Sequence, residues 1–290
     1  MTEARFKQKI DEKFQIKNQA GYLNRAFMAR PKLLGILLCY NDADILEDAI
    51  RHLLDNHHHL IVWDHGSDDG TAGVLDKYAQ YFLERKDIPR SFDFYQLYQT
   101  MSRHLIANYI HRYDWISWPD QDEFLEGAGR SMSYAEWIAK VYDEGYDYIQ
   151  FNNYNFWFTE KDDPAINSPV ARIRHYCLFP DCAPRIRSWR AVKTNIRVFN
   201  HNPLDGLRLP YLFNLRHYPM RSAPQMFRRL NKDRAGLERD GANYHYNNMT
   251  LQQQKLVIDP ALLHVDDGIS ELDPAVTYNW RNIYGYGPSK

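Results

Sequence analysis

The sequence predicts an α/β protein with a mixed, mainly parallel sheet flanked by helices and with an irregular, β-rich second half. Two observations lead to this prediction. Between residues 33 and 150, short apolar runs typical of buried strands alternate with segments of helical periodicity, which favours parallel strands. After residue 150, prolines, arginines and short extended runs dominate, as expected for antiparallel or irregular strands with long loops.

The first predicted strand is "LLGILLCY" (33–40), a continuous apolar run of the kind found in strands covered on both faces. "ADILEDAIRHLLDN" (43–56) follows with apolar residues at helical spacing, and Asn41 or Asp42 can cap this helix. "LIVWD" (60–64) completes a strand–helix–strand unit. The later predicted elements are helices near 71–81, 93–112, 133–145 and 222–236, and strands over 115–118 and 146–158.

The composition is that of an ordinary globular protein without a basic surface for nucleic acid. Lys and Arg number 36 against 37 Asp and Glu, and the formal net charge is −1. Because a nucleic-acid binder usually carries a basic excess, we expect no nucleic-acid partner. Aromatic residues make up 14% of the chain, which suits stacking of sugars or bases and suits core packing equally well.

Three cysteines without a CxxC pair predict neither a disulfide framework nor a structural zinc site. The polar N-terminus does not resemble a signal peptide, and no run reaches the ~20 apolar residues of a membrane helix. We therefore expect a cytoplasmic protein with no transmembrane segment. We divide it into an N-terminal extension (1–31), an α/β half (32–150) and a second half (151–290) within the same compact domain.

Three of the predicted strand ends are polar and acidic. They are "CYNDAD" (39–44), "WDHGSDDGT" (63–71) and "WPDQDEF" (118–124). In an open α/β sheet, ligands bind in the crevice beyond the carboxyl ends of the strands. If these strands are parallel neighbours, all three clusters open onto the same rim.

Asp120 and Asp122 favour a metal site at this rim. Carboxylates crowded at a buried rim raise one another's pKa unless a cation is present. A hard divalent ion such as Mg²⁺ or Mn²⁺ takes oxygen ligands and relieves that repulsion. Because strand side chains repeat every second residue, an extended Asp-x-Asp places both carboxylates on nearly the same side. A solvated acidic turn is the alternative interpretation.

"DHGSDDGT" (64–71) has two purely structural alternatives. A calcium loop of the EF-hand type needs a polar ligand where Gly66 stands and Gly where Asp69 stands, so it does not fit. A residue among 67–69 can cap the helix that follows. Capping does not account for Asp64, which closes the strand and faces the rim.

Taken together, these stretches resemble the family-2-type glycosyltransferases of GT-A fold. The resemblance covers about residues 33–127 and rests on "YNDADIL", "DHGSDDGT" and "DQDEFLEG", in that order. Asp42 stands where the family usually has Glu. A later "HYPMRS" segment (217–222) is similar to the HY-x-x-RS segment of the bacterial branch that carries DxDEF. Pro119 and Gln121 depart from the family pattern and leave open which carboxylate faces a metal.

The resemblance implies an inverting transferase that moves a sugar from a nucleoside-diphosphate sugar, with UDP favoured over GDP, to a hydroxyl of a glycan or lipid-linked acceptor. The half over 32–150 would bind the donor, and the half over 151–290 would bind the acceptor. Asp64 would meet the nucleobase, while Asp120 and Asp122 would serve the ribose and the metal-bound diphosphate. The expected nucleotide-sugar-binding residues are Tyr40, Asn41, Asp42, Asp64, Ser67, Asp120 and Gln121.

The metal expected from this resemblance is Mn²⁺ or Mg²⁺, held by Asp120, Asp122 and His217. Imidazole is a good ligand for Mn²⁺, and a histidine from the second half completes the metal shell in many enzymes of this fold. An ordinary edge-strand histidine is the alternative for His217. Three other histidines compete for the same role: His175, His201 and His264.

A carboxylate base should take the proton from the attacking acceptor hydroxyl. Glu123, beside the metal cluster, and Asp181, in the second half, are the candidates, with Asp205 as a further possibility. A basic stretch suits either a diphosphate or an anionic acceptor, or a solvated strand face; its residues are Arg185, Arg187, Arg190, Lys193 and Arg197. The "HHH" run at 57–59 is expected to be a solvated loop, because consecutive side chains point apart.

Two other functions remain open from the sequence. A nucleotidyltransferase can use a similar sheet and paired carboxylates, but it normally has a Gly-rich, basic loop after its first strand, which "CYNDAD" lacks. A catalytically silent carbohydrate-binding protein could be built on the same fold. Metal-dependent hydrolysis of a sugar nucleotide would exclude this second alternative.

Overall fold

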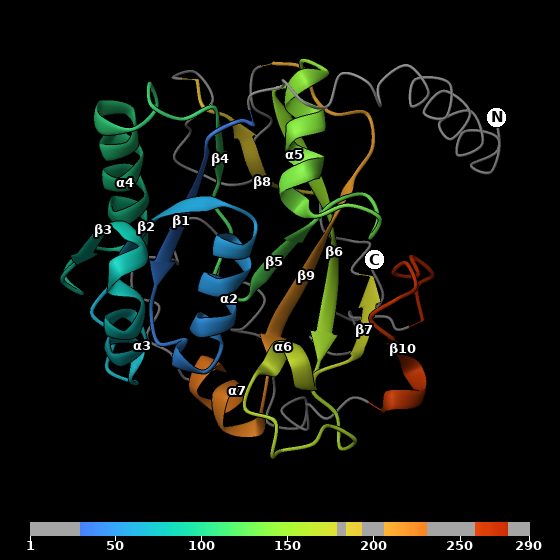
Figure 1. The fold of residues 1–290 in the computed structure, drawn as a ribbon. Helices are drawn as coiled ribbons and strands as arrows, with labels where there is room; N and C mark the ends of the chain where they lie inside the picture. Colours follow the sequence, from blue (N-terminus) through green and yellow to red (C-terminus); the bar gives the residue numbers. More distant parts are fainter. Residues whose placement is uncertain (1–29, 179–183, 193–205, 231–258, 278–290) are drawn as a thin grey trace, which may run out of the picture. The chain divides into compact units, whose positions relative to one another are not determined.

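A mixed sheet of ten strands, with helices packed against it, forms the framework of the chain (Figure 1). The structure is a computed structural model that describes residues 30–178, 184–192, 206–230 and 259–277. The predicted α/β class is confirmed. The described residues from Lys32 onward belong to one compact unit.

The first half of the chain builds the parallel part of the sheet. Its strands lie in the order β4-β1-β2-β3, and every neighbouring pair is parallel. Their bounds are Leu33–Cys39 for β1, His58–Asp64 for β2, Phe82–Asp87 for β3 and Trp115–Ser117 for β4. The connecting segments carry α2 (Ala43–Asp55), α3 (Thr71–Tyr78), the short η1 (Ala79–Tyr81) and α4 (Phe94–Asn108).

The second half adds antiparallel strands to the edge formed by β4. From β4 outward the order is β8, β6, β7 and β10, and each of these pairs is antiparallel. Figure 1 shows β5, β9 and β6 side by side: β9 pairs in parallel with β6 and antiparallel with β5. The bounds are Glu123–Glu126 (β5), Tyr148–Trp157 (β6), His175–Leu178 (β7), Arg185–Arg190 (β8), Phe213–Met220 (β9) and His264–Val265 (β10).

The remaining helices are short. Ser133 and Glu136 form a capping box that begins α5 (Tyr134–Asp143). The helix itself is the one that the apolar spacing of this segment predicts. Ser222 accepts a hydrogen bond from the backbone of Gln225 at the start of α7 (Ala223–Leu230). The others are α6 (Pro169–Arg172) and η4 (Pro260–Leu262).

Two strands have no counterpart in the prediction. β3 has the sequence FLERKD and is only half-buried at the edge of the sheet, so it lacks the apolar run that reveals β1 and β2. β5 begins at Glu123, directly after the acidic motif. The segment Asp120–Gln121–Asp122 is consequently a turn between two strands and not an extended strand end.

Apolar packing on both faces fixes the position of the parallel strands. Ile36 and Trp63 belong to one core cluster with the α4 residues Met101 and Leu105. Leu37 and Val62 belong to another, which contains the apolar face of α2. Trp115 and Trp118 are buried as well. The polar strand ends therefore project from a rigid support.

The histidine run at 57–59 corrects one prediction. His58 begins β2 and is buried, whereas a solvated loop was expected. Its Nδ1 lies 3.2 Å from the Leu53 carbonyl oxygen and its Nε2 lies 3.0 Å from the Ser117 hydroxyl. Burial lowers the pKa of His58 to about 3, so the ring is a neutral core residue.

None of the helices in the described part of the chain combines the length and the apolar character that crossing a bilayer requires.

Candidate functional site

The three acidic strand ends meet because their strands are parallel neighbours. In the register of the sheet, Cys39 at the end of β1 is opposite Asp64 at the end of β2. β4 lies on the other side of β1, and the side-chain amide of Gln121 donates to the Leu38 carbonyl oxygen. The predicted common rim is therefore present, with β1 at its centre.

Asn41 binds the loop after β1 to the loop after β2. Its backbone N–H donates to the Ser67 hydroxyl at 3.0 Å, and its side-chain amide exchanges two hydrogen bonds with Asp68. Asn41 has a positive φ of 55°, a conformation that Asn tolerates better than most residues. Asn41 and Ser67, expected to bind the donor, thus have a structural role in shaping the rim.

Asp64 is buried, with 4% of its surface exposed. One carboxylate oxygen accepts from the Ser67 hydroxyl at 2.5 Å, and the Ser67 backbone N–H lies at 3.3 Å from the same oxygen. Asp64 therefore orders the loop that follows β2. The expected contact with a nucleobase stays a prediction.

Asp69 caps two helices with one carboxylate. Its Oδ2 accepts from the Ala43 backbone N–H at the start of α2, and its Oδ1 accepts from the backbone and hydroxyl of Thr71 at the start of α3. The sequence suggested that Asn41 or Asp42 caps α2. Asp42 does occupy the cap position, but its side chain makes no capping hydrogen bond.

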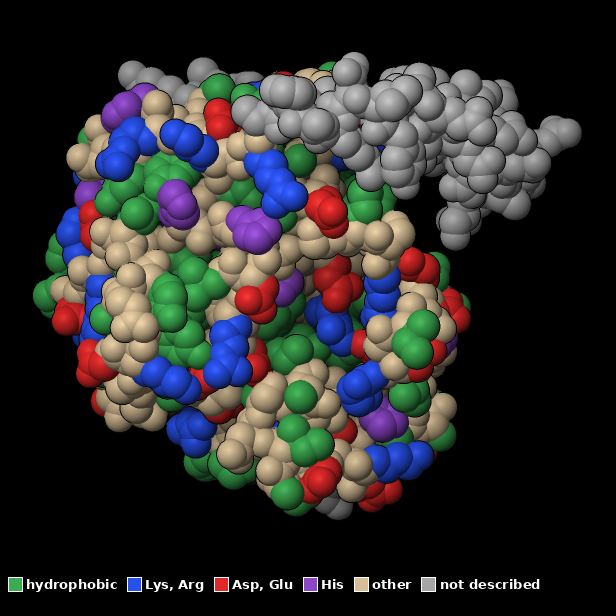
Figure 2. Space-filling model, in the orientation of Figure 1, with side chains coloured by type: hydrophobic (Ala, Val, Ile, Leu, Met, Phe, Trp, Pro, Cys, Tyr) green, Lys and Arg blue, Asp and Glu red, His purple; other side chains and the backbone are tan. Residues whose placement is uncertain are grey.

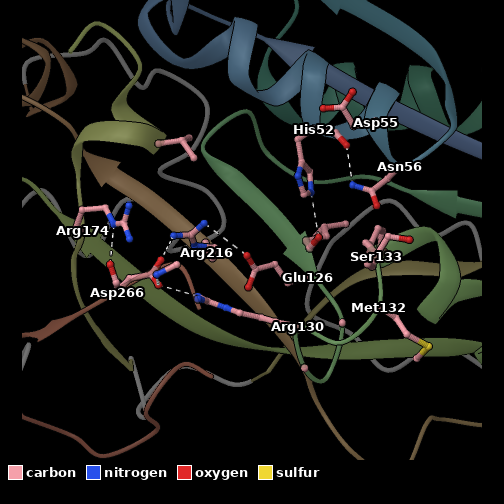
Figure 3. A pocket seen from close by; sticks show the side chains of 16 residues that line it. His52, Asp55, Asn56, Glu126, Arg130, Met132, Ser133, Arg174, Arg216 and Asp266 are labelled. Carbon is pink, nitrogen blue, oxygen red and sulfur yellow. Dashed lines mark hydrogen bonds and ion pairs between the residues drawn. The ribbon is translucent and has the colours of Figure 1, made fainter. Parts of the chain in front are cut away.

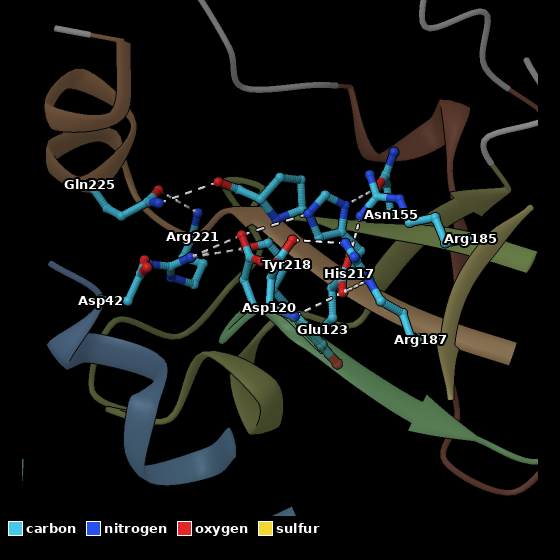
Figure 4. Close-up of polar contacts among 12 residues, drawn as sticks. Asp42, Asp120, Glu123, Asn155, Arg185, Arg187, His217, Tyr218, Arg221 and Gln225 are labelled. Atoms are coloured by element: carbon cyan, nitrogen blue, oxygen red, sulfur yellow. Dashed lines mark hydrogen bonds and ion pairs between the residues drawn. The ribbon is translucent and has the colours of Figure 1, made fainter. Parts of the chain in front are cut away.

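Arg221 connects the β1 loop to the segment after β9, and its side chain is fully buried. Its guanidinium donates to Asp42 at 2.7 Å and to both oxygens of Asp44 at 2.8 Å (Figure 4). A third carboxylate, Asp122, lies 3.8 Å away. Arg221 was not among the site residues predicted from the sequence. Two sequence features point to it: the surplus of acidic residues at the rim, which calls for a cation, and the "HYPMRS" segment, which contains Arg221.

Glu123 is neutralised by two arginines of β8. Arg187 contacts both of its oxygens, at 2.5 and 2.8 Å, and Arg185 forms a further ion pair with it (Figure 4). Burial alone would raise the pKa of Glu123, but the two guanidinium groups outweigh burial and hold the pKa at about 2. With no exposed side-chain surface, Glu123 fits a structural anion and not the acceptor base that the sequence suggested.

Asp120 is the most accessible carboxylate of the acidic turn, with 41% of its side chain exposed. One oxygen accepts from Arg187 at 2.8 Å, and the other accepts from the Tyr98 hydroxyl at 3.3 Å. Partial burial raises the pKa of Asp120, Arg187 opposes that rise, and the neighbouring Glu123 and Asp122 add to it. Asp120 can therefore hydrogen-bond a ligand at the rim.

Asp122 and His217 converge from the acidic turn and from β9. Oδ2 of Asp122 lies 3.6 Å from Nε2 of His217, and both side chains are about nine-tenths buried. Nδ1 of His217 lies 2.7 Å from the side-chain amide oxygen of Asn155. Because that oxygen can only accept, Nδ1 carries the ring proton and the lone pair of Nε2 remains toward Asp122. Burial lowers the pKa of His217, which favours the neutral ring.

The donor set of Asp122 and His217 fits a divalent ion. A separation of 3.6 Å is too long for a hydrogen bond, but it suits two ligands that each lie about 2.1 Å from one ion. A neutral histidine held by a second hydrogen bond is typical of metal sites. The described residues contain no group of three or more acidic, histidine or cysteine side chains arranged for a metal. Asp120, expected as a ligand, faces Arg187 instead.

Other predicted residues lie beside this cluster or away from it. The Arg90 guanidinium stacks on the ring of Tyr40 at 4.0 Å, so Tyr40 contributes to the rim of the β1 end. His175 contacts Thr159, and His264 contacts the Ala275 carbonyl, both away from Asp122. The base candidates Asp181 and Asp205 lie outside the described residues, as do His201, Lys193 and Arg197.

No protein-family model and no curated protein matches this chain. Among solved structures, it is similar to a crystal structure of S. aureus TarS, with a TM-score of 0.38 and 12% identity over 77% of this chain. This chain spans 47% of that TarS chain. S. aureus TarS 1–349 in complex with UDP gives a TM-score of 0.40 and 12% identity, and TarS 1–349 alone gives 0.39 and 11%. In both, 77% of each chain is covered. Similarity at this level carries no argument about function, which depends on the residues themselves.

Proposed function

We propose that the chain is a glycosyltransferase that moves a sugar from a nucleoside-diphosphate sugar to a hydroxyl of a glycan or lipid-linked acceptor. The observation that carries the proposal is the pair Asp122 and His217, which converge at 3.6 Å beside the carboxyl ends of parallel strands. The neighbouring carboxylates Asp42 and Asp120 lie 2.7 and 2.8 Å from arginines, whereas Asp122 lies 3.6 Å from His217 and 3.8 Å from Arg221. A donor that brings its own phosphate oxygens would complete a cation site at this pair.

The proposed reaction needs positive charge at the rim, beside the leaving group. Departure of a nucleoside diphosphate from the anomeric carbon places negative charge on the leaving oxygen. Asp122 and His217 would hold Mn²⁺ or Mg²⁺, which acts as a Lewis acid toward that charge when bound. Arg187 keeps Glu123 ionised and Asp120 oriented, and Arg221 holds the β1 loop against the same turn.

The remaining roles follow the division of the chain. Asp120 would accept hydrogen bonds from the ribose or the transferred sugar, because it is the accessible carboxylate of the turn. A single displacement with inversion would need a base on the acceptor side of the sugar. We assign this role to the second half, where Asp181 is the candidate, and we propose UDP ahead of GDP as the donor nucleotide.

A thermal-shift panel of nucleoside diphosphates, with and without Mn²⁺, tests the proposal. A ligand present at a hundredfold excess over its Kd stabilises the folded state by about 2.7 kcal/mol. We expect one diphosphate to raise the melting temperature only when Mn²⁺ is present. Asp122→Asn and His217→Asn should remove this shift, while Asp76→Asn, an exposed carboxylate on α3, should keep it.

Product analysis then separates the candidate activities. Release of a nucleoside diphosphate with transfer or hydrolysis of the sugar supports a glycosyltransferase. Release of pyrophosphate would instead identify a nucleotidyltransferase. A metal-independent shift of equal size, or a shift unchanged in Asp122→Asn, would contradict the assignment of the metal pair.

A further inference from the structure

A cavity of about 490 Å³ opens away from the acidic rim. It lies between the C-terminal end of α2, the segment from β5 to the start of α5, and residues of β9 and the β10 region. Figure 2 shows acidic and basic side chains gathered near the middle of this face. A cavity of this volume is large enough for a small organic ligand.

Three arginines line the cavity and surround one buried carboxylate (Figure 3). Arg130 donates to Oδ1 of Asp266 at 2.9 Å, and Arg216 forms an ion pair with Oδ2. Nε of Arg174 donates to the backbone carbonyl of Asp266 at 2.7 Å, which leaves its two terminal nitrogens outside that bond. Glu126 is 3.6 Å from Arg216, too far for a hydrogen bond.

Several polar atoms of this network are buried without a hydrogen-bond partner among the described residues. They are Nη1 of Arg130, Nε of Arg216 and Oε2 of Glu126. These three atoms are closed to solvent, so a ligand in the cavity cannot contact them directly. The same side chains reach the cavity through their other atoms, since Arg130, Arg216 and Glu126 keep 18%, 16% and 25% of their side chains exposed.

The charges of the residues that line the cavity cancel, so the guanidinium N–H donors, and not the net charge, would select a ligand. The three arginines are balanced by Glu126, Asp266 and the exposed Asp55. Asp266 already serves two arginines and the Gly268 backbone N–H. Guanidinium N–H groups that approach from several elements match the oxygens of a phosphate, to which Arg binds in a bidentate manner. The exposed part of the Glu126 carboxylate can accept from a hydroxyl of the same ligand.

This cavity is separate from the rim that holds Asp122. Arg216 and His217 are successive residues of β9, so their side chains project from opposite faces of the strand. Glu123 and Glu126 likewise stand at opposite ends of β5. A ligand in the cavity would therefore leave the metal pair accessible.

We propose that this cavity is a second binding site, for a phosphorylated sugar or polyol, in which Arg130, Arg174 and Arg216 bind the phosphate and Glu126 binds a hydroxyl. The phosphate can belong to a free metabolite-sized monoester or to a diester within a larger acceptor. The proposal does not depend on glycosyl transfer.

Titration calorimetry at constant ionic strength, without divalent metal, tests the site. The probes are inorganic phosphate, glycerol 1-phosphate as a monoester and dimethyl phosphate as a diester. We expect Arg174→Gln and Arg130→Gln each to weaken phosphate binding at least tenfold. Arg112→Gln, an exposed arginine that stacks on Tyr109, is the charge-matched control and should bind normally.

Two further variants distinguish this phosphate site from the proposed metal and donor site at the rim. Asp122→Asn should keep phosphate binding, because that residue belongs to the rim. Glu126→Gln should bind phosphate at least as well as the unaltered protein, since it removes a nearby negative charge. Absence of phosphate binding to the unaltered protein at millimolar concentration, or equal binding by Arg174→Gln and Arg130→Gln, would overturn the second site. Preference for the monoester or the diester would identify the source of the phosphate.

Discussion

Asp122 and His217 face each other at 3.6 Å, with the His217 ring held from behind by Asn155. The separation is set by backbone pairing: the Tyr218 N–H donates to the Asp122 carbonyl oxygen at 2.8 Å, and β5 pairs with β9 immediately afterwards. The two side chains are therefore positioned before any ligand arrives. Preorganised ligands of this kind bind a metal without the cost of ordering them.

Asn155 should control metal affinity through the tautomer of His217. Asn155→Ala removes the acceptor that keeps the proton on Nδ1, so Nε2 is no longer reserved for a metal. We expect Mn²⁺ affinity to fall about 10- to 100-fold, measured by Mn²⁺ titration with the preferred diphosphate. Asn152→Ala, at the opposite face of β6, is the control, and an equal loss in this variant would refute the role of Asn155.

Arg221 should contribute to stability as well as to the shape of the rim. Removal of one partner from a buried ion pair costs about 3 kcal/mol or more, and here Asp42 and Asp44 would both lose their partner. We expect Arg221→Gln to lower the free energy of unfolding by about 3 kcal/mol in urea titrations. Arg228→Gln, exposed on α7, should change it little. Equal stabilities for the two variants would contradict the buried network.

Replacement of Asp69 should destabilise two helices at once. Loss of a side-chain cap typically costs about 1 kcal/mol, and Asp69 caps both α2 and α3. Asp69→Ala should therefore lower the free energy of unfolding by about 2 kcal/mol, roughly twice the usual cost. The comparison variant is Asp76→Ala, an exposed residue of α3. A loss no larger than that of Asp76→Ala would show that the double cap contributes nothing.

His58 should make stability depend on pH below neutrality. Its pKa is about 3 in the folded state because of burial, against about 6.5 when unfolded, so the unfolded chain binds the proton between these values. This contribution to stability is complete above pH 6.5 and is lost as the pH falls toward 3. Each pH unit in that window corresponds to about 1.4 kcal/mol.

Urea denaturation at pH 6.5 and 4.5 measures this effect. Relative to His58→Gln, the unaltered protein should lose about 2.3 kcal/mol more between these two pH values, because the unfolded histidine is already half protonated at pH 6.5. His57→Asn, at an exposed position of positive φ, serves as the control and should keep the pH dependence of the unaltered protein. Identical pH profiles for the unaltered protein and His58→Gln would contradict the low pKa.

The sequence predicted the parallel strands well because burial on both faces leaves an unmistakable apolar run. β1 and β2 illustrate this, since every Leu, Ile and Val of "LIVWD" and nearly all of "LLGILLC" are buried. β3 could not be found in the same way, because an edge strand with one half-exposed face has no such run. The turn at Asp120–Asp122 was mistaken for an extended end because nothing local shows that a new strand starts at Glu123.

The sequence predicted His217 and the carboxylates of the site, but not the ion pairs of these carboxylates. Their position at strand ends is a local property, visible in "YNDAD" and "DQDEF". Their partners are not local: Arg187 pairs with Asp120 at a sequence separation of 67 residues, and Arg221 pairs with Asp42 at a separation of 179. The cavity at Arg174 and Arg216 had no sequence signal, because its walls come from elements that only the tertiary fold brings together.

The ion pairs of the rim also join segments that are translated at different times. Asp42, Asp120 and Glu123 are all translated before Arg187 and Arg221, the cations that neutralise them. A nascent chain that has completed only its parallel strands therefore has mutually repelling carboxylates at their ends. Arg187 lies in β8 and Arg221 directly follows β9, so these ion pairs can form only after both strands have left the ribosome. The later half of the polypeptide thus supplies the positive charges that neutralise carboxylates of the earlier half.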